Sequence, residues 1–192
     1  MKIVGVGCGP GLLTEEALLA LRDAPRVYGS RRAIEMARHA LPRSCEIHEI
    51  RDYSSLEFPE DAILLSTGDP MLAGLGDRGG EVIPGISSLQ LAFARLRLPL
   101  ARVSVVDGHG RDAGLAVTMT VEEVRRGKIV FLLPDPAFPL DDLAGALGRE
   151  GMACTIALCE DLGYTEERIT RGTPENPPRA RSRLFSLVVG GF

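Results

Sequence analysis

Three short apolar segments in the first half of the chain each lead into a loop that contains glycine, and then into a stretch with helical or capping character. The segments are residues 2–6, 62–66 and 81–83, and the middle one is apolar enough to be buried on both faces of a sheet. Repetition of strand, turn and helix favours a parallel sheet with right-handed crossovers. The chain is therefore predicted to have an α/β fold.

The rest of the first half continues this alternation. Further helices and strands are expected, in chain order, at 14–22, 26–28, 30–39, 45–50 and 87–97. Thr14 and Ser30 precede the first two helices and are predicted to be their N-caps. Together these elements predict a mostly parallel N-terminal lobe over residues 1–98.

Near residue 98 the pattern changes, and a second lobe is expected over residues 99–192. Its strands are expected at 103–106, 128–133, 155–158, 167–170 and 184–189, with a short helix opening at Thr120 and another helix at 139–149. The last three strands are closely spaced, which favours antiparallel pairing at an edge. We therefore expect a mixed C-terminal sheet and a ligand in the cleft between the two lobes.

Composition excludes several classes of protein. A net charge of −4 and a pI near 5.5 give no general attraction to nucleic acid. There is no apolar run of about 20 residues, and the chain starts directly with a strand, so neither a membrane span nor a signal peptide is expected. The four cysteines form no CxxC pair and no metal-site spacing with the three histidines. We expect reduced thiols, a cytoplasmic location and no protein-bound metal.

The first loop, Gly5 to Gly11, does not match the usual phosphate-binding patterns. Counted from Gly5 or from Gly7, the third glycine of a dinucleotide fingerprint falls on Pro10 or on Leu12. No carboxylate follows the second strand, and no lysine completes a P-loop. A plain strand-to-helix turn is an equally good reading of this loop alone.

The second and third loops also have simple structural readings when each is taken alone. Asp69, in the stretch STGDP, fits a turn or a helix cap, and Ser87 with Ser88, in PGISS, fits an N-cap. All three loops follow strands of one lobe, so they should line one rim. Because they offer backbone groups and one carboxylate but no lysine or arginine, they suit a cationic or zwitterionic, adenosine-sized ligand better than a pyrophosphate.

Six stretches of sequence carry a resemblance to a known family. GCGPG at 7–11, STGDP at 66–70 and PGISS at 84–88 resemble the successive motifs of the tetrapyrrole methylases, which use S-adenosyl-L-methionine. EVIPGISSLQL at 81–91, GHGR at 108–111 and CEDLGY at 159–164 followed by ERI resemble the precorrin-6Y/cobalt-precorrin-7 methylase (CbiE-type) branch of cobalamin synthesis. The resemblance covers nearly the whole chain.

This resemblance implies a two-lobed fold, a homodimer and a cofactor folded into the interlobe cleft. The residues that it implies for cofactor binding are Gly7, Gly9, Pro10, Gly68, Asp69, Leu72, Ser87, Ser88 and Leu133. Two departures from the family pattern, a short first loop and a short segment after Gly76, bear on substrate identity more than on the cofactor.

The implied reaction is methylation of carbon 5 of a corrinoid. Its main requirement is alignment of carbon, methyl and sulfur, so no nucleophile from the protein is expected. Asp69 and His109 are candidate acceptors for the ring proton, although His109 also fits a plain turn residue. Arg78 and Arg111 are candidates for binding the substrate carboxylates, or are solvated surface arginines. A separate protein that acts at carbon 15 is a candidate partner.

Three alternatives stay open at this point. A sister methylase could act on another ring carbon, in sirohaem synthesis, or on a diphthamide or ribosomal RNA substrate. A non-catalytic nucleotide- or corrinoid-binding module would bind ligand without methyl transfer. A dinucleotide oxidoreductase would bind NAD, but the missing third glycine and ribose carboxylate count against it.

Overall fold

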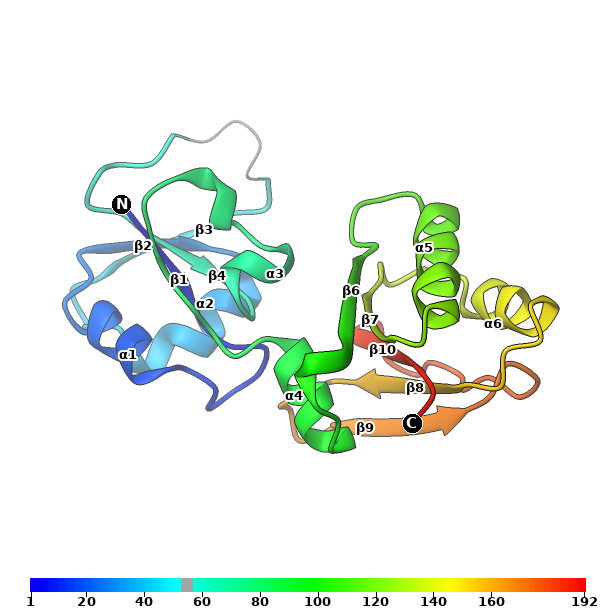
Figure 1. The fold of residues 1–192 in the computed structure, drawn as a ribbon. Helices are drawn as coiled ribbons and strands as arrows, with labels where there is room; N and C mark the ends of the chain where they lie inside the picture. The colour runs from blue at the N-terminus through cyan, green and yellow to red at the C-terminus, as the bar shows by residue number, and fades with distance from the viewer. Residues whose placement is uncertain (53–56) are drawn as a thin grey trace. The chain divides into compact units, whose positions relative to one another are not determined.

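The computed structural model describes residues 1–52 and 57–192, which form two compact units, Met1–Ser88 and Leu89–Phe192 (Figure 1). The sequence places the boundary later, at residue 98, so the two divisions differ by one helix, α4 (Ser88–Leu96). In the structure Arg95 of α4 pairs with Glu167, with Nε and Oε1 2.6 Å apart, which ties the helix to the second unit.

The first unit is built on a parallel sheet with the strand order β3-β2-β4-β1-β5. The strands are β1 (Lys2–Gly5), β2 (Arg26–Gly29), β3 (Glu46–Glu49), β4 (Ile63–Ser66) and β5 (Glu81–Ile83). The strand β1 pairs Val4 with Leu65 of β4 on one side and with Ile83 of β5 on the other. Because all strands are parallel, the loops after β1, β4 and β5 leave from the same edge of the sheet. The predicted parallel sheet is confirmed.

Short helices accompany this sheet. They are α1 (Glu15–Arg22), α2 (Arg31–Ala37), α3 (Pro70–Ala73) and the 3₁₀ turns η1 (Arg38–Ala40) and η2 (Gly76–Arg78). The hydroxyl of Thr14 accepts a hydrogen bond from the Ala17 amide at 3.1 Å, and that of Ser30 accepts from Ala33 at 3.2 Å. Both predicted N-caps are confirmed, and each satisfies a backbone N–H that the first helical turn leaves free.

The second unit has a mixed sheet with the strand order β6-β7-β10-β8-β9. Its strands are β6 (Val103–Asp107), β7 (Ile129–Leu133), β8 (Thr155–Glu160), β9 (Arg168–Gly172) and β10 (Phe185–Gly190), after the 3₁₀ turn η3 (Leu100–Arg102). β6 and β7 are parallel, whereas β10 is antiparallel to both β7 and β8, and β8 is antiparallel to β9. The strands β6, β7 and β8 therefore run in one direction, and the predicted mixed sheet is confirmed.

Two helices pack on this second sheet, and one of them begins earlier than the sequence predicts. The helix α6 (Leu140–Arg149) buries Leu143 and Leu147 as expected. The helix α5 (Ala113–Arg125), however, begins well before Thr120, where a short helix was predicted to open. Its cap is Asp112, whose carboxylate accepts from the Leu115 amide at 2.9 Å. Thr120 instead lies buried in mid-helix.

Local sequence explains this error. The first turns of α5 contain Gly114 and the β-branched Val117 and Thr118, all poor helix formers. Packing compensates, because Ala116 and Val121 belong to the core of the unit, and the Thr120 hydroxyl donates to the Ala116 carbonyl at 2.8 Å. Tertiary contacts thus override a weak local preference.

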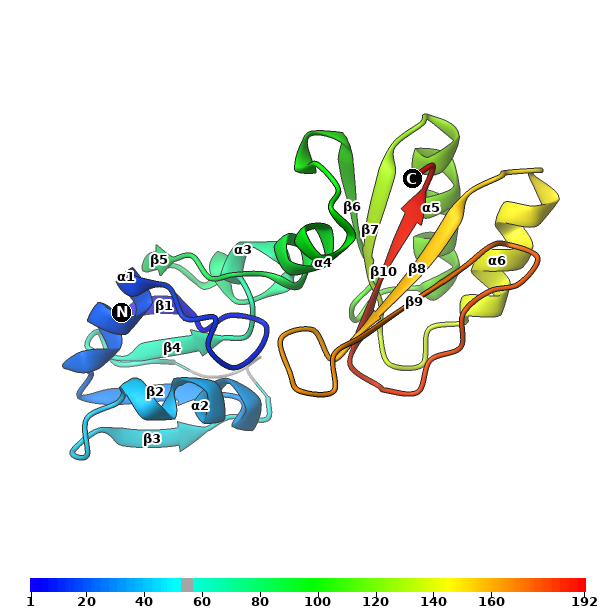
Figure 2. The ribbon, with the colours of Figure 1, turned by 90° about the horizontal axis from the view of Figure 1, so that it is seen from below.

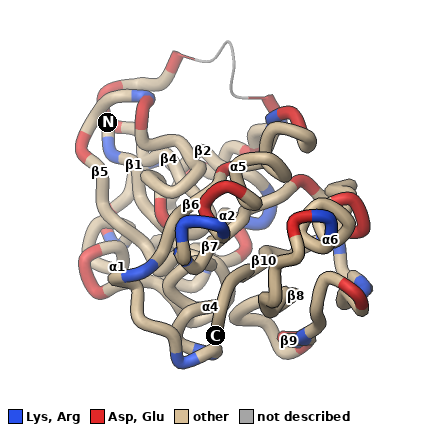
Figure 3. The backbone as a smooth tube through the Cα atoms, turned by 45° about the vertical axis from the view of Figure 1, so that its right-hand side comes forward, with Lys and Arg blue, Asp and Glu red and all other residues tan. Residues whose placement is uncertain are grey.

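Charges of both signs are scattered along the backbone rather than separated by sign (Figure 3). All four cysteines are in the thiol form, and three of them, Cys8, Cys154 and Cys159, are buried. No helix in the described part of the chain has the length and apolar character to cross a membrane.

Candidate functional site

The three loops of the first unit touch one another through their backbones. Gly7 and Gly68 form an isolated bridge in which the Gly68 amide donates to the Gly7 carbonyl at 2.7 Å. The Cys8 amide donates to the Ile86 carbonyl at 2.9 Å, which joins the first loop to the third. The expectation that these loops line one rim is therefore met within this unit.

Glycine is required where the loops approach most closely. A Cβ on Gly85 would lie 2.2 Å from the Gly68 carbonyl oxygen, and one on Gly5 would lie 2.5 Å from the Gly85 nitrogen. Gly7 and Gly68 also have φ values of +81° and +70°, which side chains other than glycine rarely adopt. The three loops are thus packed main chain against main chain, with no room for a side chain between them.

Asp69 braces two of these loops. Its Oδ1 accepts from the Met71 amide at 2.8 Å and caps α3, while its Oδ2 accepts from the Gly85 amide at 3.1 Å. Both carboxylate oxygens are therefore engaged by backbone groups. A carboxylate held in this way keeps its two loops in place.

Most of the residues implied for cofactor binding gather in these loops. Those in the first unit are Gly7, Gly9, Pro10, Gly68, Asp69, Leu72, Ser87 and Ser88. Pro10 is exposed, whereas Gly9 and Ser87 are buried. Leu133 ends β7 and belongs to the second unit. Arg78, in η2, lies in the first unit, and Arg111 lies in the second.

One contact at this rim has no counterpart among the residues predicted from the sequence. The guanidinium of Arg32, from α2, donates to the Cys8 carbonyl at 2.6 Å. Arg32 is far from the loop motifs in sequence and reaches the first loop only because α2 follows the neighbouring strand β2. Nothing in the local pattern around Arg32 signals this role.

The second unit brings a different cluster together at the ends of β6 and β7. His109 lies just past β6, and its Nδ1 is 2.9 Å from Oδ1 of Asp135, which follows β7. The Gly110 amide also donates to the Asp135 carboxylate, at 3.1 and 3.2 Å. Because Nδ1 faces a carboxylate, the neutral imidazole carries its proton there, and Nε2 is left as an acceptor.

Asp107 organises the same loop from its other side. Its Oδ1 accepts from the His109 amide at 3.1 Å, and its Oδ2 lies 3.2 Å from Nε of Arg111. The Gly108 amide donates to the Leu133 carbonyl at 2.9 Å, which places His109 next to the loop after β7. The structure therefore joins His109, Arg111 and Leu133, all of them predicted site residues, and adds Asp107 and Asp135, which the sequence analysis did not identify.

Cys159 and Glu167, also in this unit, have shifted pKa values. Burial raises the pKa of the Cys159 thiol to about 12, so this thiol stays protonated at neutral pH. Burial also tends to raise the pKa of Glu167, but hydrogen bonds from Arg95 and from the Gly163 amide outweigh it and hold that pKa below its ordinary value. Within the described residues, no three His, Cys, Asp or Glu side chains are arranged to hold a metal ion.

The chain is similar to known methylases along most of its length. The family described as Tetrapyrrole (Corrin/Porphyrin) Methylases matches residues 2–177. A probable cobalt-precorrin-7 C(5)-methyltransferase of Methanocaldococcus jannaschii is 28% identical over 187 residues, covering 86% of each chain.

Two solved structures share the fold. The cobalamin biosynthesis precorrin-6Y methylase (CbiE) of Archaeoglobus fulgidus has a TM-score of 0.74 and 30% identity, and the match covers 100% of this chain and 98% of that one. A uroporphyrin-III C-methyltransferase of Thermus thermophilus, solved with S-adenosylhomocysteine, has a TM-score of 0.70 and 22% identity, with 98% and 96% coverage. The second likeness supports the fold alone.

Proposed function

The chain belongs to the tetrapyrrole methylase family, and we propose that it is an S-adenosyl-L-methionine-dependent methyltransferase that methylates carbon 5 of cobalt-precorrin-7 or of precorrin-6Y in cobalamin biosynthesis. The observation that carries this proposal is the likeness to proteins of that branch along nearly the full length of the chain. The motifs at 81–91 and 108–111, quoted above, agree with it.

The backbone rim of the first unit suits the cofactor. Gly5, Gly68 and Gly85 are buried and let the three loops pack main chain against main chain, because a Cβ on Gly5 or Gly85 would clash with a neighbouring loop. When bound, S-adenosylmethionine supplies an activated methyl group on a sulfonium. The rim carries polar backbone atoms and the Asp69 carboxylate, which suits a ligand with a positive centre better than a polyphosphate.

His109 is the group to which we assign the ring proton. Replacing a ring hydrogen by the methyl of a sulfonium forms one C–C bond, breaks one S–C bond and releases one proton. Nε2 of His109 can accept this proton, because Nδ1 lies 2.9 Å from Oδ1 of Asp135, which orients the ring with Nε2 as the acceptor. Asp69 is the weaker of the two predicted candidates, since both of its oxygens accept backbone N–H groups.

Arginines bind the carboxylates of the substrate in this proposal. Arg111 has 64% of its side chain exposed and is tethered by Asp107, so its remaining N–H donors can face a carboxylate with little loss of freedom. In the first unit, Arg78 at the end of η2 is the arginine that we assign to a substrate carboxylate. No nucleophile or resident metal of the protein is required, and any cobalt belongs to the substrate.

We also propose a homodimer. Exposed apolar side chains lie on α5 and on β6, the edge strand of the second sheet: Leu115 is 56% exposed, Met119 42% and Val105 42%. Apolar groups of this kind are commonly covered in an oligomer. A separate protein that acts at carbon 15 and removes the carboxyl group, and a cytoplasmic location, stay predictions of the sequence.

A turnover experiment tests the function. The purified protein is incubated with S-adenosylmethionine and cobalt-precorrin-7, and in parallel with precorrin-6Y, and the products are analysed by mass spectrometry and NMR. We expect a gain of one methyl group, at carbon 5, on one of the two substrates. Methylation of a different carbon would favour a sister methylase, and binding of S-adenosylhomocysteine without turnover would favour a non-catalytic module.

A further inference from the structure

One edge of the second sheet gathers more polar groups than the proposed reaction uses. Since β6, β7 and β8 run in one direction, the residues that follow them leave from the same edge. Because β10 runs the opposite way, the segment that precedes it arrives at this edge too, and Phe185 pairs with Glu160 at the end of β8. Figure 2 shows these strand ends and the segment before β10 together. The edge therefore carries the His109 loop, Glu160 and the residues just before Phe185.

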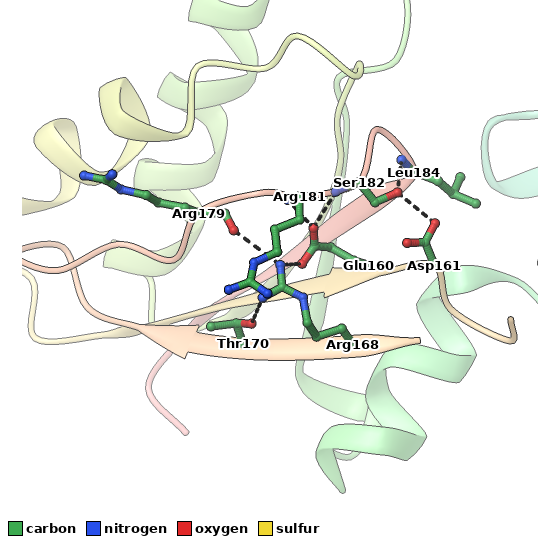
Figure 4. A network of polar contacts seen from close by, with 8 residues as sticks. All are labelled: Glu160, Asp161, Arg168, Thr170, Arg179, Arg181, Ser182 and Leu184. Atoms are coloured by element: carbon green, nitrogen blue, oxygen red, sulfur yellow. Dashed lines mark hydrogen bonds and ion pairs between the residues drawn. The ribbon is translucent and has the colours of Figure 1, made fainter. Parts of the chain in front are cut away.

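Glu160 is a carboxylate that has been almost wholly removed from water. It is 1% exposed, and every partner it has at this edge is a donor (Figure 4). Its Oε1 accepts from the amides of Arg181 and Ser182, at 2.6 and 2.8 Å, and its Oε2 pairs with the guanidinium of Arg168. Burying a charge is costly unless partners of this kind compensate, so the network fixes the backbone that supplies them.

The same segment is held at further points. The Ser182 hydroxyl donates to Asp161 at 2.8 Å and accepts from the Leu184 amide at 3.0 Å. The Asp161 amide donates to the Leu184 carbonyl at 2.9 Å. Arg168 adds a contact to the carbonyl of Arg179 at 3.4 Å. A surface segment outside any strand or helix is thus fixed at both of its ends.

This fixed segment reads Arg179-Ala180-Arg181-Ser182-Arg183, and its three arginines are exposed. In Figure 4 the Arg179 side chain points away from Glu160, although its carbonyl faces Arg168. Across residues 1–52 and 57–192, no ion pair joins Arg179, Arg181 or Arg183 to a carboxylate. The chain as a whole has a net charge of −4, so three uncompensated guanidinium groups in a fixed segment need an explanation.

We propose that Arg179, Arg181 and Arg183 form a binding surface for the peripheral carboxylates of the corrinoid substrate, and that Glu160 is the residue that positions it. This inference rests on the proposed function for the identity of the ligand. Guanidinium groups bind carboxylates through paired N–H donors, and holding the backbone in advance lowers the ordering cost of binding. Arg111, at the same sheet edge, extends the surface toward His109.

A small polycarboxylate fits this surface better than a nucleic acid does. The basic stretch is short, and it lies in a chain of net negative charge with 5% aromatic residues, so it offers little for base stacking or for a long phosphate backbone. It adjoins the strand ends that carry His109 and Asp135, where the ring of a substrate would lie during proton transfer. The arginines therefore suit the rim of that substrate.

The test uses two corrinoids that differ in side-chain charge. Cobyrinic acid carries free carboxylates, and cobinamide carries amides in their place. We expect the wild-type protein to bind cobyrinic acid more tightly, with an affinity that falls as salt is added. The triple variant Arg179→Gln, Arg181→Gln, Arg183→Gln should bind cobyrinic acid about tenfold more weakly and bind cobinamide unchanged.

A matched control carries the same charge change at the opposite edge of the sheet. Arg102, Arg125 and Arg149 precede β6, end α5 and end α6, and they are exposed. Changing all three to Gln should leave both affinities at the wild-type value. Equal weakening by the two triple variants, or equal weakening for the two corrinoids, would overturn the proposal. So would tight binding of a single-stranded oligonucleotide that the first triple variant alone abolishes, since the ligand would then be a nucleic acid.

S-adenosylhomocysteine separates this inference from the proposed function. Each variant is titrated with it, and unchanged affinity shows that the variants are folded and still bind the cofactor product. Wild-type protein that fails to bind it would refute the proposed function and not the arginine surface. Glu160→Gln should weaken cobyrinic acid binding in the same selective way. If that variant does not fold, Ser182→Ala removes two of the tethers more gently and should give a smaller loss of the same selectivity; no loss would contradict the positioning role.

Discussion

The two units present sites of opposite construction. In the first unit, three loops meet through main-chain atoms, and glycines at the centre leave no room for a side chain. In the second unit, the polar edge of the sheet is made by charged side chains, with His109 on Asp135, Arg111 on Asp107, and Glu160 beneath an arginine segment. The first site is therefore built from main-chain atoms, and the second from paired charged side chains.

This difference matches the two ligands of the proposed reaction. The cofactor is the same molecule in every turnover, so a rigid site made of main-chain atoms can bind it. A substrate with many carboxylates needs guanidinium groups and a proton acceptor, which side chains supply. We therefore expect changes in the three glycine loops of the first unit to act on cofactor binding, and changes at the polar edge of the second sheet to act on the substrate or on the chemical step.

The largest effect is expected at His109. His109→Gln removes the proton acceptor, and we expect kcat to fall by about a hundredfold. Affinity for S-adenosylhomocysteine, measured by calorimetry, should not change, because the rim of the first unit is untouched. Asp135→Asn should lower kcat less, since the imidazole remains but loses its carboxylate. If a His109 variant kept the wild-type kcat, His109 would not be the residue that accepts the proton.

The converse change is Gly85→Ala. The new Cβ would lie 2.2 Å from the Gly68 carbonyl oxygen, and overpacking of this kind costs about 1–3 kcal/mol. We expect a lower midpoint of thermal unfolding and loss of S-adenosylhomocysteine binding, with the arginine surface still able to bind cobyrinic acid. Gly191→Ala is the control, because a Cβ there meets nothing within 4 Å. Equal behaviour of the two variants would mean that the loops do not need close backbone contact.

A smaller effect is expected at the start of α5. Asp112→Ala removes the side chain that accepts from the Leu115 amide at 2.9 Å, and loss of such a cap costs about 1 kcal/mol. Asp112→Asn keeps the acceptor and should restore most of that stability in a urea titration. If alanine and asparagine were equivalent, the cap would contribute nothing, and the helix would be held by packing alone.

The smallest effect concerns pH. The pKa of Glu167 is held below its ordinary value of about 4.3, so its contacts with Arg95 and Gly163 stabilise the folded state above that pH. This contribution is lost as the pH falls from there through the lowered folded value. Glu167→Gln should therefore flatten the decline in unfolding free energy between about pH 5 and pH 3. An unchanged slope would show that Glu167 has the same pKa in the folded and unfolded states.

The sequence predicts the framework well because its signals are local. The caps Thr14 and Ser30 and the apolar strand predicted at 62–66 can be found from a few neighbouring residues, and each is present in the structure, the strand as Ile63–Ser66. The start of α5 was predicted wrongly because tertiary packing, and not local propensity, forms its first turns.

The site is only partly visible in the sequence. Glycine motifs mark the three loops, since close approach needs glycine wherever it occurs. Partners such as Asp135 for His109, Arg32 for Cys8 and Arg168 for Glu160 join residues from different elements. Such pairs depend on strand order, and the order β6-β7-β10-β8-β9 has no local signal.

Amide hydrogen exchange, followed by mass spectrometry, tests the contrast between the two units most directly. Exchange is measured in the free protein, with S-adenosylhomocysteine, and with cobyrinic acid. We predict that S-adenosylhomocysteine slows exchange in the three loops at 5–12, 67–74 and 84–88, and that cobyrinic acid slows it at 107–111 and 179–184. Protection of the three loops by neither ligand, or of 179–184 by S-adenosylhomocysteine alone, would contradict the assignment of cofactor and substrate to these two surfaces.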